Sequence, residues 1–158
     1  MNTEYLIASI GKIKIGIDCH DIRNVYRQAL KIIPIANQDP IYAGITSLAN
    51  QTMPVIDLRK RAHLQAAAET SIHNIITFQT GMTRQLAILV DDIIGMEGIN
   101  PSAIQKSNDN LHNQQSNINL LFPTIAILKD QSLLHIMDST YLDKQEPIAE
   151  DSGELELF

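Results

Sequence analysis

The chain has 158 residues, of which 44% are hydrophobic and 19% charged, a composition typical of a soluble globular domain. Its net charge of −6 has the wrong sign for general binding to nucleic acid or to an anionic membrane, so we expect neither partner. No apolar run reaches the roughly 20 residues that span a bilayer, and the N-terminal residues lack the basic region of a signal peptide. We therefore predict a cytoplasmic protein without direct membrane insertion.

Short apolar runs of strand length, separated by turn residues, follow one another along the chain. The first two are residues 5–10 and 12–17, and Gly11 between them indicates a tight hairpin. The runs that follow are residues 22–26, 31–35, 44–47, 52–57, 72–79, 85–91, 93–96, 122–128 and 133–137. This spacing predicts an all-β fold, either barrels or a sandwich, and it excludes a doubly wound α/β pattern.

The remaining segments predict short helices and loops. Residues 58–68 and 101–104 each favour one or two helical turns, and Asp138 favours a short helix that continues to Lys144. Residues 105–119 are rich in Asn, Gln and Ser, which indicates a surface loop. We predict one domain over residues 1–144 and a disordered acidic tail over residues 145–158.

Four apolar runs end in aspartate, at Asp18, Asp57, Asp91 and Asp138. An aspartate at a strand end accepts hydrogen bonds from nearby backbone N–H groups and starts a turn. A carboxylate metal site is the alternative, but nothing in the spacing requires the four side chains to converge. We therefore interpret them as turn-starting residues.

Catalytic and metal-binding patterns find little support in the sequence. There is no glycine-rich phosphate loop and no Gly-x-Ser-x-Gly nucleophile motif, and the five histidines are not spaced as zinc ligands. Cys19 follows Asp18, whose charge raises the pKa of a neighbouring thiol, so we expect a structural cysteine. We predict no enzyme activity, no cofactor and no metal.

Residues 44–59 carry a family resemblance. Pro54-Val55-Ile56-Asp57-Leu58-Arg59 resembles the apolar-apolar-Pro-apolar-apolar-Asp-Leu-Arg signature of the CheW family. Upstream, Gly44, Ile45 and Leu48 match its Gly-apolar-x-Asn-Leu-Arg-Gly segment. Further segments follow in the family's order, among them residues 15–18, 22–25, 86–91 and 123–138, so the resemblance covers residues 4 to 143.

The resemblance implies two five-stranded, SH3-like β-barrels that share a hydrophobic core. It also implies a non-enzymatic adaptor in a chemosensory pathway of flagellar or type IV pilus type, recruited to membrane-associated receptor arrays. The implied partners are the regulatory domain of a CheA-type histidine kinase and the cytoplasmic tip of a methyl-accepting chemoreceptor. The residues carried over as partner-binding are Ile22, Asn24, Val25, Gly44, Leu48, Ala49, Asn50, Val90 and Asp91. A charged residue at Ile22 or Gly44 is expected to weaken binding without unfolding the domain.

Two departures from the family pattern affect these expectations. Ala49 and Asn50 stand where the family has Arg-Gly, and Asn24 stands where it often has glutamate. The chain is therefore an active coupler, an accessory copy, a competitor, or an adaptor repurposed to another partner. A small-molecule-binding β-barrel and an enzyme of unrecognised type are the alternatives from other classes.

The last five residues carry a separate motif. Glu154-Leu155-Glu156-Leu157-Phe158 resembles the Gln-Leu-x-Leu-Phe peptides that bind DNA-polymerase sliding clamps, although its first residue differs. The alternatives are a peptide-type contact of Leu155, Leu157 and Phe158 with another protein, or a tail whose Leu157 and Phe158 rest on the domain.

Overall fold

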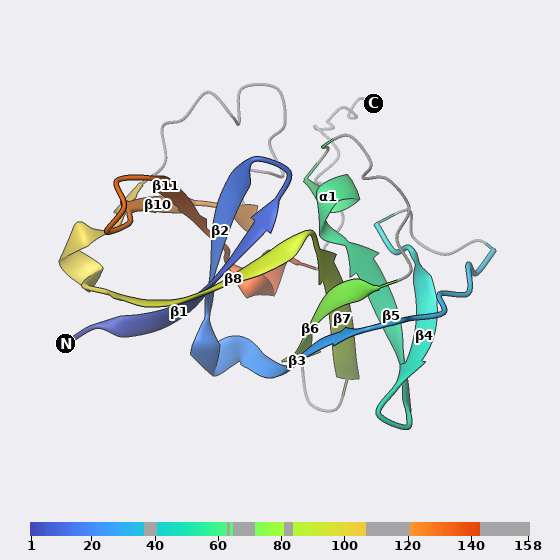
Figure 1. Cartoon of the computed structure of the whole chain (residues 1–158). Helices are drawn as coiled ribbons and strands as arrows, with labels where there is room; N and C mark the ends of the chain where they lie inside the picture. The colour runs from blue at the N-terminus through green and yellow to red at the C-terminus, as the bar shows by residue number, and fades with distance from the viewer. Residues whose placement is uncertain (37–40, 63, 65–71, 81–83, 107–120, 143–158) are drawn as a thin grey trace, which may run out of the picture.

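The structure is a computed structural model, and it describes residues 1–36, 41–62, 64, 72–80, 84–106 and 121–142. The strands form two sheets (Figure 1). The first sheet has the order β8-β1-β2-β11-β10-β9, with β1 (Thr3–Ile10), β2 (Ile13–Asp18), β8 (Asp92–Ile99), β9 (Gln105–Lys106), β10 (Thr124–Ile127) and β11 (Leu133–Ile136). The second has the order β3-β6-β7-β5-β4, with β3 (Ile22–Gln28), β4 (Gly44–Leu48), β5 (Gln51–Asp57), β6 (His73–Thr80) and β7 (Arg84–Val90).

Each sheet joins strands that are distant in the chain through one parallel pair. In the first sheet β11 pairs in parallel with β2, and in the second β5 pairs in parallel with β7. The other pairs are antiparallel, including the β1–β2 hairpin, where Gly11 has a φ of 64° in the left-handed region that suits glycine.

The largest buried cluster joins the two sheets. Ile15 and Ile17 from β2 pack in one cluster with Ile56, Ile76 and Ile88 from the second sheet, and all five are 0% exposed. Burial of one isoleucine side chain contributes about 1.5–3 kcal/mol to folding, so this contact holds the two halves together. The predicted mainly-β fold with two halves around a shared core is confirmed, and the two-residue β9 adds a sixth strand to the first half.

Strand β1 belongs to two cores at once. Leu6, Ala8 and Ile10 point into the cluster between the sheets, whereas Tyr5 and Ile7 pack in a second cluster within the first sheet's half. Because successive side chains of a strand point to opposite faces, a strand that is apolar at every position is buried on both faces. The run of residues 5–10, which is apolar except at Ser9, indicates this arrangement.

Three strand-end aspartates cap short helices, as predicted. The helices are η1 (Cys19–Asp21), α1 (Leu58–Arg61) and η4 (Ser139–Tyr141), and η2 (Pro101–Ala103) follows β8. Asp18, Asp57 and Asp138 each accept a hydrogen bond from the backbone N–H two residues on, at 2.9, 3.1 and 3.1 Å. Each side chain therefore satisfies an N–H that the first turn of a helix leaves without a partner.

Two segments differ from expectation. Residues 31–35 form a single β-bridge, Ile33 with Ile45, instead of a strand. Pro34 has no backbone N–H to donate, so it cannot extend the bridge into a ladder. Residues 105–106 form β9 instead of loop, because they pair with Thr124 and Ile125. Most of the predicted loop, the end of the predicted helix at 58–68 and the tail at 145–158 lie outside the described residues.

Candidate functional site

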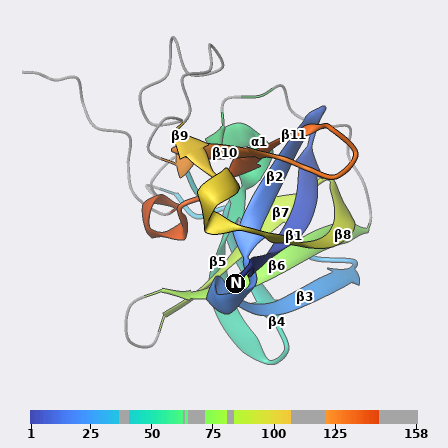
Figure 2. The same ribbon diagram turned by 90° about the vertical axis from the view of Figure 1, so that its left-hand side faces the viewer.

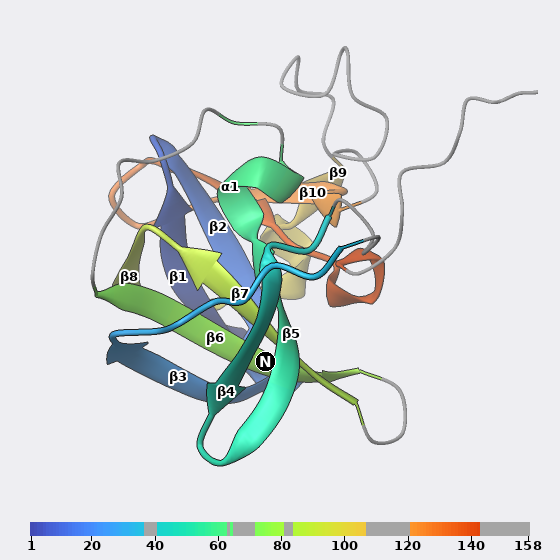
Figure 3. The same ribbon diagram turned by 90° about the vertical axis from the view of Figure 1, so that its right-hand side faces the viewer.

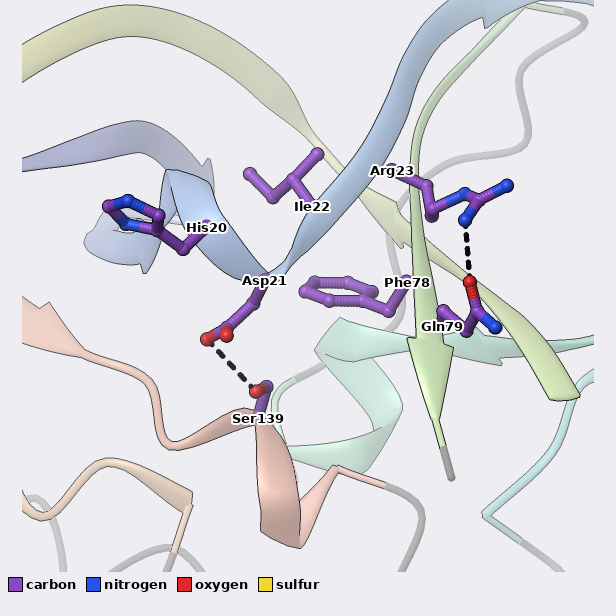
Figure 4. A pocket seen from close by; sticks show the side chains of 7 residues that line it. All are labelled: His20, Asp21, Ile22, Arg23, Phe78, Gln79 and Ser139. Carbon is purple, nitrogen blue, oxygen red and sulfur yellow. Dashed lines mark hydrogen bonds between the residues drawn. The ribbon is translucent and has the colours of Figure 1, made fainter. Parts of the chain in front are cut away.

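A cavity of about 330 Å³ lies where the two halves of the molecule meet (Figure 4). It lies at the start of β3, one of the predicted partner-binding segments. Its lining comes from η1, β3, the end of β6 and η4, so both halves contribute to it. The lining residues are His20, Asp21, Ile22, Arg23, Phe78, Gln79 and Ser139.

Two hydrogen bonds organise the cavity walls. Ser139 Oγ donates to Asp21 Oδ2 at 3.1 Å, which ties η4 to η1, and Arg23 Nη1 donates to Gln79 Oε1 at 2.5 Å, which ties β3 to β6 (Figure 4). The apolar side chains of Ile22 and Phe78 lie between these two polar contacts. The cavity therefore offers mainly hydrogen-bonding groups, with Ile22 and Phe78 as its apolar residues.

Strand β3 is an open edge of its sheet. It pairs with β6 and, within the described part of the chain, with no other strand. Asn24 is exposed and Val25 is 44% exposed, whereas Ile22 is half-buried and packs against the shared core. An edge strand with free backbone groups and an exposed apolar side chain is a surface on which another chain docks.

The predicted residues on β4 are placed differently. Gly44 is buried with a φ of 152°, and a Cβ added to it would collide with the carbonyl oxygen of Ile33. The expectation that a charged residue at Gly44 leaves the domain folded is therefore wrong. Leu48 is also buried, at 2% exposed, and packs with the core residues of the second sheet.

Ala49 and Asn50 form the two-residue turn between β4 and β5. Both are exposed, and their φ angles are 50° and 64°. Two successive positive φ angles define a type I′ turn, which favours Asn or Gly over alanine. The family's Arg-Gly at these positions supplies a glycine at the second one, so the departure in this chain also raises the cost of the turn.

The last two predicted residues lie at the end of β7. Val90 is buried at 7% exposed, and the carboxylate of Asp91 accepts a hydrogen bond from the backbone N–H of Gly11. Asp91 Oδ2 also lies 2.8 Å from Nη2 of Arg59. Asp91 therefore fixes the β1–β2 turn and α1 to the end of β7, and it does not start a turn of its own as the other three aspartates do.

The basic run Arg59-Lys60-Arg61 is not a basic surface patch. Arg59 pairs with Asp91, and Arg61 is only 4% exposed and donates to the backbone oxygens of Tyr141 and Leu142 at 2.8 and 3.1 Å. Only Lys60 of the three is exposed. The buried guanidinium of Arg61 holds the end of η4 against α1.

Sequence reasoning missed two exposed apolar residues on β8. Ile94 is 51% exposed and Met96 is 61% exposed, on the outer strand of the first sheet. The β1–β8 register skips Ile94, because Ile7 pairs with Gly95 and Ala8 with Ile93. The sequence shows the apolar run of residues 93–96, but it does not mark β8 as a sheet edge, so it gave no signal that these side chains would be exposed.

The single cysteine, Cys19, lies in η1, which also contributes to the cavity lining. Burial, followed by the charge of Asp18, raises the pKa of the Cys19 thiol, in agreement with the expectation for this half-buried cysteine. Among the residues that the structure describes, no three His, Cys, Asp or Glu side chains gather to hold a metal ion, and no helix is long and apolar enough to cross a membrane.

Comparisons with known proteins agree with this geometry. The family model of the CheW-like domain matches residues 4–145. A crystal structure of the scaffolding protein TtCheW from Thermoanaerobacter tengcongensis has a similar fold, with a TM-score of 0.74 and 20% sequence identity over 94% of this chain and 99% of that one. A search of curated protein sequences finds no match. The family model spans most of the chain, and the chain belongs to the CheW-like domain family.

Proposed function

We propose that this protein is a non-enzymatic adaptor that couples a CheA-type histidine kinase to methyl-accepting chemoreceptors, in a chemotaxis or type IV pilus pathway. The observation that carries the proposal is the CheW-like domain over residues 4–145. The similar structure is that of a protein described as a scaffold, which supports the same class of role. The protein would act in the cytoplasm, on receptor arrays at the membrane.

The exposed apolar residues suggest where the partners bind. Val25 lies on β3 and Ile94 and Met96 lie on β8, and both strands are the outer members of their sheets. Figures 2 and 3 place β8, β6 and β3 one above another on the same side of the molecule. An apolar centre with polar surroundings supplies affinity at a protein interface, so this side is the proposed docking surface.

The proposal is tested by calorimetric titration of the protein with two partners from the same genome. These are the regulatory domain of a CheA-type kinase and the cytoplasmic tip of a chemoreceptor. Binding in the micromolar range or tighter is expected, and Val25→Asp is expected to weaken it. Ile127→Asp is the matched control, since Ile127 is 55% exposed on β10 of the other sheet. Failure of every such kinase domain and receptor tip to bind would overturn the proposal.

A second titration separates an active coupler from an accessory copy. The double variant Ala49→Arg with Asn50→Gly restores the family pattern in the β4–β5 turn. If the chain is an active coupler that has changed its contact chemistry, the variant leaves kinase and receptor affinity within about twofold of the original. If the chain is an accessory copy, the restored arginine raises the affinity by tenfold or more, which corresponds to about 1.4 kcal/mol.

A further inference from the structure

The charges of this chain are divided very unevenly. Residues 143–158 contain six of the 18 acidic residues and one of the 12 basic ones, so they carry a charge of −5 out of the total of −6. Residues 22–36, which comprise β3 and the segment after it, contain three basic residues and no acidic one. The two segments therefore have opposite charge.

The basic residues of this segment are exposed and have no ionic partner in the described part of the chain. They are Arg23, Arg27 and Lys31, and the described ion pairs all lie elsewhere. Val25 and Arg27, two residues apart, point to the same face of β3. The open edge strand thus presents an apolar side chain and a cation side by side.

We infer that residues 154–158, Glu-Leu-Glu-Leu-Phe, dock on β3 of the same molecule. Their apolar and acidic residues alternate in the first four positions, the pattern of a strand with one apolar and one polar face. Added to the free edge of β3, this strand places its glutamates on the face that carries Arg27 and its leucines on the opposite face, beside the half-buried Tyr26. The cavity at the start of β3, lined by Ile22 and Phe78 together with polar side chains, lies at one end of this edge.

The connection is short enough for this contact. The described chain ends at Leu142, directly after η4, and Ser139 of η4 is hydrogen-bonded at 3.1 Å to Asp21, the residue before β3. The 11 residues 143–153 reach at most about 3.3–3.6 Å each, and the seven residues of β3 extend for about 3.3 Å each. Every position on β3 is therefore within reach.

Tethering makes a weak contact sufficient. A short covalent connection gives the attached segment an effective concentration in the millimolar range, so a segment with millimolar intrinsic affinity occupies its site for much of the time. Exposed charge pairs are screened by salt, so occupancy falls as ionic strength rises. The docked segment would compete with a partner for β3. That consequence rests on the proposed function, whereas the docking itself does not.

The test is paramagnetic relaxation in the full-length protein without any partner. A spin label is attached at Gly153→Cys in a Cys19→Ser background, which removes the native thiol. We expect loss of the amide signals of Arg23, Val25 and Arg27 at low salt and their recovery at high salt. The amides of Lys129–Ser132, in the β10–β11 hairpin of the other sheet, serve as the unaffected reference.

Charge variants and a mixing control decide the outcome. Glu154→Lys with Glu156→Lys is expected to restore the β3 signals, and Leu155→Ala with Leu157→Ala to do the same. Persistence of all β3 signals in the labelled protein would overturn the inference. The mixing control combines spin-labelled protein at natural isotope abundance with ¹⁵N protein that has no spin label. Loss of the β3 signals in this mixture would also overturn the inference, because the segment would then bind a second copy. A kinase or receptor that fails to bind leaves this test unaffected.

Discussion

The two edge strands of the second sheet, β3 and β4, meet the same physical problem in opposite ways. A sheet edge carries unpaired backbone groups that invite another strand. On β4, alternate residues are buried, and the segment after β3 folds over it through the Ile33–Ile45 bridge. On β3, no residue is fully buried, and no strand of the described chain lies beyond it. The comparison separates an edge that another segment of the chain covers from an edge that stays open in the described chain.

The largest expected effect is at Gly44 on the covered edge. Gly44→Ala places a Cβ against the carbonyl of Ile33 at a positive φ, so we expect it to destabilise the domain by roughly 2–4 kcal/mol. Urea unfolding measures this. Gly95→Ala on β8 is the matched control, since a Cβ there meets nothing within 4 Å. Equal stability of the two variants would show that the segment around Ile33 can move away from β4 at little cost.

A substitution on β3, the open edge, should affect partner binding more than stability. Val25→Asp is expected to change the free energy of unfolding by less than about 0.5 kcal/mol, because the side chain is already 44% exposed. It is expected to weaken binding of a kinase domain or receptor tip by tenfold or more, equivalent to about 1.4 kcal/mol. Unfolding and calorimetric titration measure the two effects. A destabilised variant with unchanged affinity would reverse the assignment of the two edges.

A hydrogen bond also holds the segment after β3 against β4, and its loss is expected to have a smaller effect on stability. Thr46 is 3% exposed, and its Oγ1 donates to the carbonyl oxygen of Lys31 at 2.6 Å. Thr46→Val is expected to lower the free energy of unfolding by roughly 1–2 kcal/mol, because the carbonyl loses its partner. Thr52→Val, at an exposed position on the neighbouring β5, should be nearly neutral in the same urea titration. Equal losses in both variants would exclude a special role for this bond.

The β4–β5 turn is expected to gain stability. Asn50→Gly removes a side chain from a residue with a φ of 64°, so we expect an increase of about 0.5–1 kcal/mol in the free energy of unfolding. Ser47→Gly, in the extended part of β4, should instead lower the stability by a similar amount. Thermal unfolding distinguishes the two variants. A loss of stability in Asn50→Gly would mean that the asparagine side chain supports the turn.

The smallest expected effect concerns Cys19 in η1, the short helix before β3. Burial raises the pKa of the Cys19 thiol, and the charge of Asp18 raises it further. Asp18→Asn removes the charge and keeps a side chain that caps η1, so the thiol pKa falls, the thiolate fraction at pH 8 rises and alkylation by iodoacetamide becomes faster. Asp138→Asn at the cap of η4 is the control. An unchanged alkylation rate in Asp18→Asn would show that the charge of Asp18 does not raise the pKa of the thiol.

The sequence predicted local features better than distant contacts. Asp18, Asp57 and Asp138 act within two residues of their own position, so their role follows from the local pattern. Asp91 looks the same in the sequence, yet its partners are Gly11 and Arg59, which are 80 and 32 residues away. No periodicity or turn signal specifies such pairings, because they depend on which strands become neighbours.

The candidate site shows the same division. Val25 is exposed and its partner-facing role stays a prediction, whereas Gly44 was assigned to the same surface and is buried beneath Ile33. A glycine in a motif indicates a backbone requirement or a close approach, and only the fold tells which chain approaches. Ile94 and Met96 remained unassigned for a related reason, since the position of β8 at the sheet edge depends on long-range pairing.

The parallel pair of β2 and β11 has a consequence for synthesis of the chain. β1 and β2 leave the ribosome before the other described strands, but β11 ends at Ile136, so their sheet stays incomplete until nearly the whole described chain has emerged. The second sheet uses only residues 22–90 and has all its strands available much earlier. We therefore expect it to fold first during translation, with the N-terminal hairpin held on its apolar face until the last strand arrives.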